Sequence, residues 1–277
     1  MPRYALTIAY DGTDFHGWQK QHPPDSEPLR TVQGLVEAAV EELIREPVHV
    51  LGASRTDSGV HAEGQVACFN SPREFDPKVL PAALTSRLPQ DVQVRSAWQV
   101  DPAFNPIGDA ISKGYRYRLA YARTTAEMRP LFDRHVTSWC PGELDLKAMQ
   151  QAAGDLVGMH DFAAMTRVRH NRETTVREIF DCTVTEDGDR RLSIDVSGSG
   201  FLWNMVRIIA GTLVEVGEGR IDPTSIPDIL ASGDRQRSGR TMPPEGPCLM
   251  WIRFGAAGSG RAKQQLARAR DQADSAE

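Results

Sequence analysis

Residues 52–62 have the sequence GASRTDSGVHA, and this stretch decides how the rest of the chain is interpreted. Small residues dominate it and apolar segments lie on both sides, which is typical of a tight loop between two strands. Its one carboxylate, Asp57, stands two residues after Arg55 and four before His61. Gly59 allows the backbone to turn sharply and a ligand to approach it. The stretch therefore predicts a loop that presents a carboxylate.

Two interpretations of Asp57 follow from the residues alone. An arginine within hydrogen-bonding range lowers the pKa of a carboxyl group by about 1–3 units. Because Arg55 is so near in the chain, we expect Asp57 to stay ionised, and an ionised, oriented carboxylate can act as a nucleophile at carbon. The alternative is that Asp57 and Arg55 form a bridge that only stabilises the turn.

The composition is that of an ordinary globular protein, because 40% of the 277 residues are hydrophobic and 25% are charged. The net charge of −5 argues against a purely electrostatic nucleic-acid binder, although it is compatible with a local basic groove. The four cysteines form no C-x-x-C pair, which excludes a zinc ribbon or a thioredoxin-like site. No stretch approaches the roughly 18 apolar residues that span a bilayer, and signal-peptide features are missing. We expect a soluble, cytoplasmic protein that does not contact a membrane.

Hydrophobic periodicity predicts strands and helices in mixed order, which favours the α+β class over a repeating βαβ unit. Thr31 is a suitable N-cap for the first helix, which Pro47 ends. The predicted strands are Tyr4–Tyr10, Val48–Leu51, Gln65–Asn70, Val92–Val100, Lys113–Tyr121, Thr175–Thr185, Arg191–Val196 and Cys248–Phe254. The predicted helices are residues 32–43, Pro77–Leu88, Asp145–Leu156 and Trp203–Val216.

The loop Asp101–Gly108 contains two prolines and is the best boundary between two halves of the chain. We predict an N-terminal α+β lobe over residues 1–105, which carries the loop with Asp57, and a C-terminal α+β lobe over residues 106–254. Residues 255–277 contain one large apolar side chain and cannot bury enough surface to offset chain entropy. We therefore predict that they form a mobile tail.

The loop contains the string Arg-Thr-Asp-x-Gly-Val-His at residues 55–61. This string resembles the signature loop of the TruA family, the bacterial tRNA pseudouridine synthases that act on the anticodon arm. Other stretches resemble later landmarks of that family, so the similarity covers nearly the whole chain up to Phe254. They are residues 10–13 (YDGT), 15–19 (FHGWQ), 31–33 (TVQ), 64–66 (GQV), 115–117 (YRY), 158–162 (GMHDF) and 205–207 (MVR).

The resemblance implies the pseudouridine synthase fold, in which two similar α/β lobes surround a continuous, mostly antiparallel sheet with a central cleft. It implies isomerisation of uridine to pseudouridine at positions 38, 39 and 40 of the anticodon stem and loop of transfer RNA. In this reaction the N-glycosidic bond breaks, the uracil turns and a C–C glycoside forms, without metal or other cofactor. The resemblance also implies a homodimer, in which one transfer RNA contacts both subunits.

The resemblance assigns four residues to the site. Asp57 occupies the place of the nucleophile, and attack at the sugar C1′ or assistance to the departing uracil are both open. Arg55 corresponds to an arginine thought to enter the space of the flipped base, where a planar guanidinium can fill the gap. Tyr115 matches the active-site tyrosine, which could stack on uracil or move a proton at its C5. Arg207 matches a basic residue that pairs with the nucleophile from the other half, and the alternative is a helix arginine that pairs with Glu215 or faces solvent.

Some neighbouring residues have a structural interpretation that we prefer. His61 could be a general base, but a hydrogen bond that stabilises the loop is sufficient to explain it. Strand alternation places Tyr117 and Tyr121 on the same face as Tyr115, where core packing explains both, and two arginines of this strand on the other face.

A basic stretch at residues 167–177 holds four Arg, one His and one Glu. Together with Lys113, Arg116, Arg118 and Arg123, it predicts a phosphate-binding groove on an acidic chain. The alternative for the stretch is a solvated loop. For Arg116 and Arg118, phosphate contacts and surface ion pairs are both open.

The chain departs from the family pattern at several positions. Asn105 and Ile107 stand where His and Arg are usual, Thr85 where Asn is common, and Pro247 where Leu is usual. These departures affect the expected RNA contacts and leave the nucleophile untouched.

Two other function classes are weighed against the enzyme. A non-catalytic RNA-binding homologue has no need of a carboxylate that faces a phosphate-rich ligand, so the joint presence of Asp57 with Arg55, Tyr115 and Arg207 favours catalysis. A glycosidase-like hydrolase usually needs two carboxylates that flank the bond. Near this loop only Asp57 and Glu63 are available, and Glu63 is expected to point away.

Overall fold

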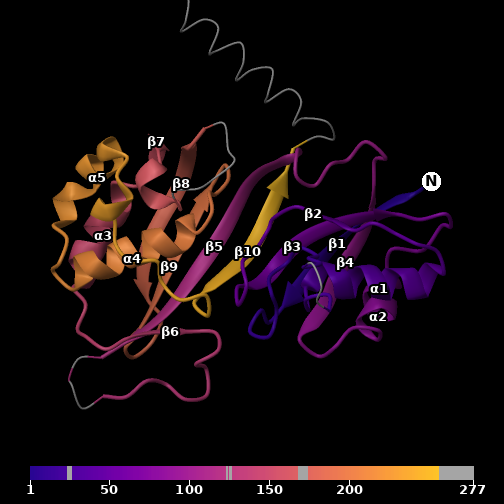
Figure 1. The fold of residues 1–277 in the computed structure, drawn as a ribbon, viewed down its shortest axis with the longest axis horizontal. Helices are drawn as coiled ribbons and strands as arrows, with labels where there is room; N and C mark the ends of the chain where they lie inside the picture. The colour runs from indigo at the N-terminus through magenta and orange to yellow at the C-terminus, as the bar shows by residue number, and fades with distance from the viewer. Residues whose placement is uncertain (24–26, 123, 125–126, 168–173, 256–277) are drawn as a thin grey trace, which may run out of the picture.

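The computed structural model describes residues 1–23, 27–122, 124, 127–167 and 174–255. In this part of the chain a single large sheet runs through both halves, and one group of helices lies at each end of it (Figure 1). The predicted α+β class is confirmed.

The ten-stranded sheet consists of β1 (Arg3–Tyr10), β2 (Leu51–Gly52), β3 (His61–Asn70), β4 (Val92–Val100), β5 (Ala110–Tyr121), β6 (Ser138–Cys140), β7 (Gly158–Asp161), β8 (Val176–Glu186), β9 (Arg191–Gly198) and β10 (Pro247–Phe254). The described α-helices are α1 (Val32–Ile44), α2 (Leu80–Thr85), α3 (Leu146–Gly154), α4 (Met205–Gly217) and α5 (Ile226–Ser232). Short 3₁₀ turns occupy Ala163–Met165, Pro223–Ser225 and Arg235–Arg237.

The last strand of the sheet in sequence, β10, lies in its middle. The strand order is β4-β1-β3-β10-β5-β9-β8-β7, with β2 beside β3 and β6 beside β5. Neighbours are antiparallel except for β10 with β3 and β6 with β5, so the continuous, mostly antiparallel sheet is confirmed. In β10, Cys248 pairs with His61 of the first half, and Leu249 pairs with Tyr115 of the second.

Helix α1 forms where the sequence predicts it. The extended residue Thr31 accepts a hydrogen bond from the backbone N–H of Gly34 at 3.4 Å, which satisfies an amide of the first turn. The helix ends at Arg45, whose φ of 60° is left-handed, two residues before Pro47. Its apolar stripe is buried at Val32, Val36, Ala39, Val40 and Ile44.

The main core lies between the helices and one face of the sheet. Alternate residues of β5 belong to it, and Tyr117 and Tyr121 are buried there, which confirms core packing for both. A smaller cluster on the opposite face includes Phe104 and Phe254, whose rings meet edge to face at 5.1 Å. The sheet is therefore covered unequally, and the face that bears the helices is the face of Tyr115.

Several boundaries differ from the predicted ones for identifiable reasons. Strand β3 begins at His61 instead of Gln65, because its first two residues pair with β10, almost two hundred residues away in the chain. Helix α2 is shorter than predicted and starts near Pro81, a residue suited to a first helical turn. Strand β2 shrinks to two residues, and the short elements β6, β7 and α5 were not predicted.

The proposed division at residues 105 and 106 stays a prediction, because the sheet continues through both halves. Of the predicted tail, residues 256–277 lie outside the described residues. None of the described helices combines the length and the hydrophobicity that crossing a bilayer requires.

Helix α4 packs closely against residues 239–242. A Cβ added at Gly211 would overlap the backbone oxygen of Arg240. The amide of Gly239 donates a hydrogen bond to Thr212 Oγ1 at 3.0 Å, also on this helix. The absence of a side chain at position 211 is therefore what lets this segment reach the helix.

We expect Gly211→Ala to lower the free energy of unfolding by about 1–3 kcal/mol, because the added methyl group overpacks this contact. Chemical denaturation monitored by circular dichroism measures the change. Gly154→Ala in α3 is the matched control, because its Cβ meets no atom within 4 Å and a helical alanine is favoured over glycine by about 1 kcal/mol. Equal stability of Gly211→Ala and the unsubstituted protein would contradict the packing argument.

Candidate active site

The loop between β2 and β3 is anchored on both sides of Asp57. The Tyr10 hydroxyl shares a hydrogen bond with Thr56 Oγ1 at 2.7 Å, and the Thr56 carbonyl accepts the Trp18 amide at 3.1 Å. The side-chain amide of Gln65 donates to the Ser54 carbonyl at 2.6 Å and accepts the Ser54 amide at 3.2 Å. Side chains from β1 and β3 therefore fix the backbone that carries the carboxylate.

Two glycines make this loop geometry accessible. Gly17 has a φ of 86°, and a Cβ at this position would come within 2.6 Å of the Thr56 carbonyl oxygen. Gly59, two residues after Asp57, has a φ of 78°, a left-handed value that favours glycine. The YDGT and FHGWQ stretches thus lie against the loop and support it.

Asp57 is half-buried, and the groups around it act in opposite directions on its acidity. Burial is the strongest influence and raises the pKa of its carboxyl group above the usual value. The positive charge of Arg207, a hydrogen bond from the Trp203 indole and the positive charge of Arg167 all lower the pKa, and they offset part of this rise. The net direction is upward, which corrects the expectation of a lowered pKa. The cations that lower the pKa of Asp57 also differ from Arg55, which the spacing suggested, because Arg207 and Arg167 come from the other half of the chain.

Arg207 enters the site from the first turn of α4. Its Nε donates to the Met242 carbonyl at 2.6 Å, and a terminal nitrogen donates to Asn204 Oδ1 at 3.2 Å. These bonds fix the guanidinium group where its charge reaches Asp57. Pairing with Glu215, the alternative from sequence, is not what the structure has, because Glu215 interacts with Arg240.

Tyr115 of β5 is brought to the same loop. Its hydroxyl lies 3.2 Å from Ser54 Oγ, and its ring meets Phe201 edge to face at 5.2 Å. Burial raises the pKa of the phenol to about 12, and the negative charge of Asp57 adds to the rise. At neutral pH the side chain is therefore a protonated phenol beside a carboxylate.

Arg55 is exposed and has no side-chain hydrogen bond or ion pair with any residue that the structure describes. The bridge between Asp57 and Arg55 that the sequence leaves open as an alternative is therefore not formed. The guanidinium group is instead presented to solvent from the rigid loop.

His61 has the structural role that the sequence favours. Its Nδ1 accepts the backbone N–H of Gly12 at 3.0 Å, and Asp11 Oδ1 lies 3.1 Å from the same nitrogen. Burial lowers the pKa of the imidazole, while Asp11 opposes the change. The neutral ring therefore ties the end of β1 to the start of β3.

Sequence reasoning missed Trp203 and the position of Arg167 beside Asp57. Both act on Asp57, and the Arg167 guanidinium lies over the Trp203 ring, 4.7 Å from its centroid. Trp203 precedes α4 in the FLW stretch, and a large aromatic residue two positions before the MVR stretch was the available signal. Residues 168–173 of the predicted basic stretch lie outside the described residues.

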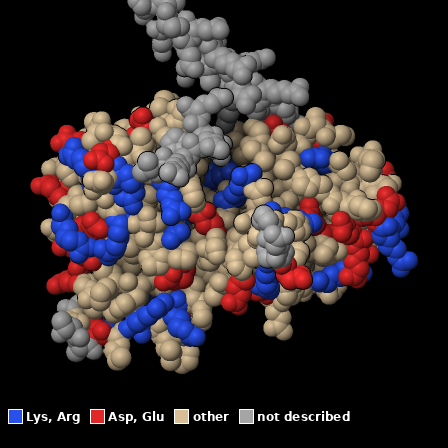
Figure 2. Space-filling model, in the orientation of Figure 1, with Lys and Arg blue, Asp and Glu red and all other residues tan. Residues whose placement is uncertain are grey.

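The other predicted groove residues are used differently. Lys113 Nζ donates to the Ala53 carbonyl at 2.8 Å and so supports the loop with Asp57. Arg116 forms an ion pair with Asp195 at 2.8 Å, on the face of the sheet opposite Tyr115. Of the two interpretations that the sequence left open for Arg116, the surface ion pair is therefore the one that forms. Arg123 is outside the described residues. Figure 2 shows Lys and Arg side chains over the half that carries α3, α4 and α5, with acidic side chains among them.

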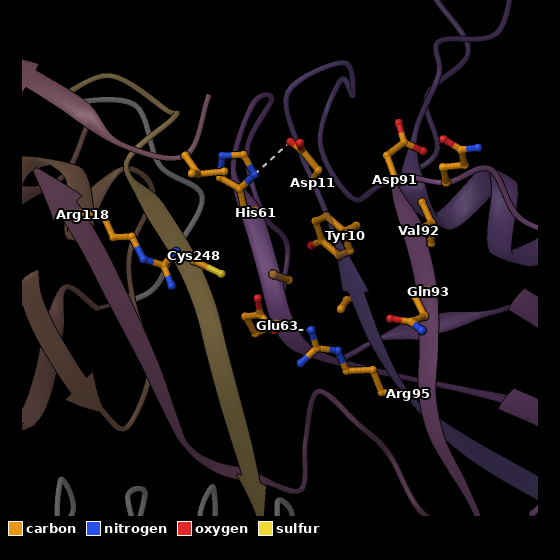
Figure 3. Close-up of a pocket in the computed structure, with 14 residues that line it drawn as sticks. Tyr10, Asp11, His61, Glu63, Asp91, Val92, Gln93, Arg95, Arg118 and Cys248 are labelled. Atoms are coloured by element: carbon orange, nitrogen blue, oxygen red, sulfur yellow. Dashed lines mark ion pairs between the residues drawn. The ribbon is translucent and has the colours of Figure 1, made fainter. Parts of the chain in front are cut away.

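A pocket of about 230 Å³ lies on that opposite face and does not include Asp57 (Figure 3). Arg118, Cys248 and Glu63 line it, and Glu63 pairs with Arg95 at 2.5 Å. Because Glu63 faces this pocket, it is not the second carboxylate of a hydrolase site built on Asp57.

The departures from the family pattern have local structural explanations. Asn105 Oδ1 accepts the amides of Ile107 and Gly108, both at 3.0 Å, and the buried Asp109 accepts the Asn105 amide at 2.9 Å. The segment is a self-bonded turn that leaves Ile107 exposed. Pro247 is buried as the first residue of β10, where its missing N–H is tolerated.

Among the described residues, no group of three His, Cys, Asp or Glu side chains is arranged to hold a metal ion.

Comparison with known proteins places this site in a family. The family model for tRNA pseudouridine synthase matches residues 6–105 and 152–255. Proteins named tRNA pseudouridine synthase A share 44% identity in Geotalea uraniireducens, over 91% of this chain and 99% of the relative. The protein of that name in Myxococcus xanthus is 42% identical over 90% of this chain and 91% of the relative. The one in Caldicellulosiruptor saccharolyticus is 40% identical over 90% of this chain and 98% of the relative.

With matches of this extent over both halves that build the site, the chain belongs to the tRNA pseudouridine synthase family.

Proposed function

We propose that this protein isomerises uridine to pseudouridine at positions 38, 39 and 40 of the anticodon arm of transfer RNA, with Asp57 as the nucleophile. The observation that carries the proposal is the half-buried Asp57 carboxylate, which faces the charge of Arg207 and the indole of Trp203. A purely structural acid at a turn does not need groups from a second half of the chain. The reaction and the substrate are inferred from the family to which the chain belongs and from the resemblance of this loop to the family's signature loop.

The proposed role of Asp57 follows from its surroundings. Burial makes its carboxylate more basic than that of a free aspartate, and fixed cations favour the anion that the reaction needs. The anion attacks the sugar C1′ or assists the departing uracil, and both routes break the C1′–N1 bond. The C1′–C5 bond then forms, and the proton on C5 is lost while N1 gains one, so the product is an isomer of the substrate.

The other proposed site residues have complementary roles. Arg55, exposed on the rigid loop, takes the space that the target base leaves when it turns out of its stack. Tyr115 lies under the base and holds its hydroxyl beside Ser54. Arg207 pairs electrostatically with Asp57 from α4. No cofactor takes part in this scheme, and a homodimer that holds one transfer RNA between its subunits completes it.

A non-catalytic RNA-binding homologue is the alternative. It would keep basic and aromatic residues, but a half-buried carboxylate with a raised pKa costs folding free energy and repels phosphate. The arrangement therefore favours the enzyme.

The test of the function is incubation with unmodified transfer RNA, followed by mapping of pseudouridine by nucleotide-resolution chemistry. We expect product at positions 38–40 with the unsubstituted protein and none with Asp57→Ala, while RNA binding survives in a filter-binding assay. Asp14→Asn, an exposed acid nearby in the fold, is the control and should retain activity. A normal rate in Asp57→Ala would remove Asp57 as the nucleophile, and product at other positions alone would overturn the proposed specificity.

Tyr115→Phe should lower kcat by about a hundredfold if the hydroxyl moves the C5 proton, since general acid–base catalysis contributes about 10²–10⁴-fold. Single-turnover kinetics on transfer RNA measure the change, and thermal melting checks the fold. Tyr121→Phe is the matched control, because this tyrosine lies on the same face of β5 but is a core residue. An unchanged rate in Tyr115→Phe would restrict Tyr115 to contacts made by its ring.

Asp57 should also lower the stability of the protein near neutral pH. Because its pKa is raised on folding, the folded chain binds the proton more tightly than the unfolded chain does. This group's stabilising contribution is therefore greatest below its unfolded pKa of about 4 and is lost as pH rises through the folded pKa. We expect Asp57→Asn to have a higher Tm than the unsubstituted protein at pH 7, with a difference that shrinks towards pH 4. The exposed Asp14→Asn should show no such trend, and a lower Tm of Asp57→Asn at pH 7 would contradict the assignment.

A further inference from the structure

Trp203 is an exposed aromatic residue at the entrance to α4. It is 46% exposed, whereas Leu202 and Met205 on either side of the start of the helix are buried. Exposing part of an indole ring forgoes the free energy of burying it, so a large exposed aromatic beside a reactive group is a candidate contact for a ligand.

The edge and the face of this side chain have different partners. The edge lies near enough to Asp57 for the indole N–H to lower the pKa of its carboxyl group. The face carries the planar guanidinium of Arg167 at 4.7 Å from the ring centroid. Thr166 Oγ1 donates to the Trp203 carbonyl at 3.1 Å and holds the two stretches together.

The group that covers the ring resembles a nucleobase in shape. A guanidinium and an unpaired base are both flat, both stack on aromatic rings, and an arginine that leaves the ring can bind a phosphate of the same nucleotide. Stacking of a base on an aromatic side chain contributes substantially to the binding of unpaired RNA and tolerates any base. Asp57 at the edge of the ring places such a base next to the reacting carboxylate.

We propose that Trp203 is a positioning residue and a stacking platform for an unpaired base of the RNA substrate. Its indole N–H orients Asp57, and its face accepts the base when Arg167 turns from the ring to a phosphate. The inference rests on the proposed function for the identity of the RNA, but the stacking can be measured without turnover.

The groups that face Asp57 among the described residues are Arg207 from α4, Arg167 and Trp203 from the segments beside it, and Tyr115 from β5. Of these, the indole lowers the pKa of Asp57 without carrying a charge. Removing it withdraws one influence that lowers the pKa of Asp57, so the acid limb of activity moves to higher pH.

A second stacked pair provides the control. Arg253 lies over the ring of Trp251 at 4.5 Å from its centroid. Trp251 packs on the Cα of Gly114, which puts it on the face of the sheet opposite Tyr115. This pair has the same chemistry as the pair of Trp203 and Arg167, but it is remote from Asp57.

Trp203→Phe keeps an aromatic face and loses the N–H, whereas Trp203→Leu loses both. Titration with unmodified transfer RNA should quench the tryptophan fluorescence of the unsubstituted protein and of Trp251→Phe, and most of this quenching should vanish in Trp203→Phe. We expect Trp203→Leu to raise the Kd for transfer RNA about tenfold. The pH dependence of kcat should show its acid limb at higher pH in Trp203→Phe and unchanged in Trp251→Phe.

Circular dichroism and melting curves verify that each variant is folded, and Trp203→Phe keeps the test decisive if Trp203→Leu is not. Undiminished quenching in Trp203→Phe overturns the platform, and an unmoved acid limb overturns the positioning role. If the unsubstituted protein forms no pseudouridine in transfer RNA while the quenching still depends on Trp203, the proposed function fails and the platform stands.

Discussion

The pairing of β10 with β3 on one side and with β5 on the other is the constraint on which the site depends. Asp57 belongs to the loop that leads into β3, and Tyr115 belongs to β5, so one strand sets the separation between them. Pairing of Cys248 and Leu249 with β3, and of β10 along most of its length with β5, resists sliding of the two halves. Strand β10 therefore joins the strands of the two halves into one sheet, and this pairing brings the carboxylate to the groups that act on it.

The electrostatics of Asp57 follow from that pairing of β10 with both halves. The second half contributes Arg207, Arg167 and Trp203 to a carboxylate that the first half has already partly removed from water. Removal from water makes the anion more basic, while the three partners keep it oriented and limit the rise of its pKa. A partly buried carboxylate with a raised pKa costs stability, and the hydrogen bonds that anchor Ser54 and Thr56 help the fold to tolerate it.

The sequence was sufficient for some features and insufficient for others, for physical reasons. Local periodicity located α1 and β4, and strand alternation put Tyr115 and Tyr117 on one buried face. The motif pointed to Asp57 as the candidate, and the family resemblance pointed to Arg207 as its partner from the other half, which acts on it. The spacing in the loop alone suggested Arg55, which has no side-chain ion pair with any described residue. Which cation acts on a carboxylate is decided by tertiary contacts, and no local pattern contains them. The start of β3 was missed for the same reason, because its pairing with β10 is long-range.

The two faces of the sheet show how far position, rather than residue type, determines what a side chain can do. Arg116 and Arg118 follow Tyr115 closely in sequence, yet alternation turns them away from Asp57, one to Asp195 and one to a separate pocket. The two stacked pairs of tryptophan and arginine make the same point, because Trp251 lies over a glycine on the far face while Trp203 borders the Asp57 carboxylate. The difference lies in their neighbours, because the indole of Trp203, and not that of Trp251, is among the groups that act on the Asp57 carboxyl group.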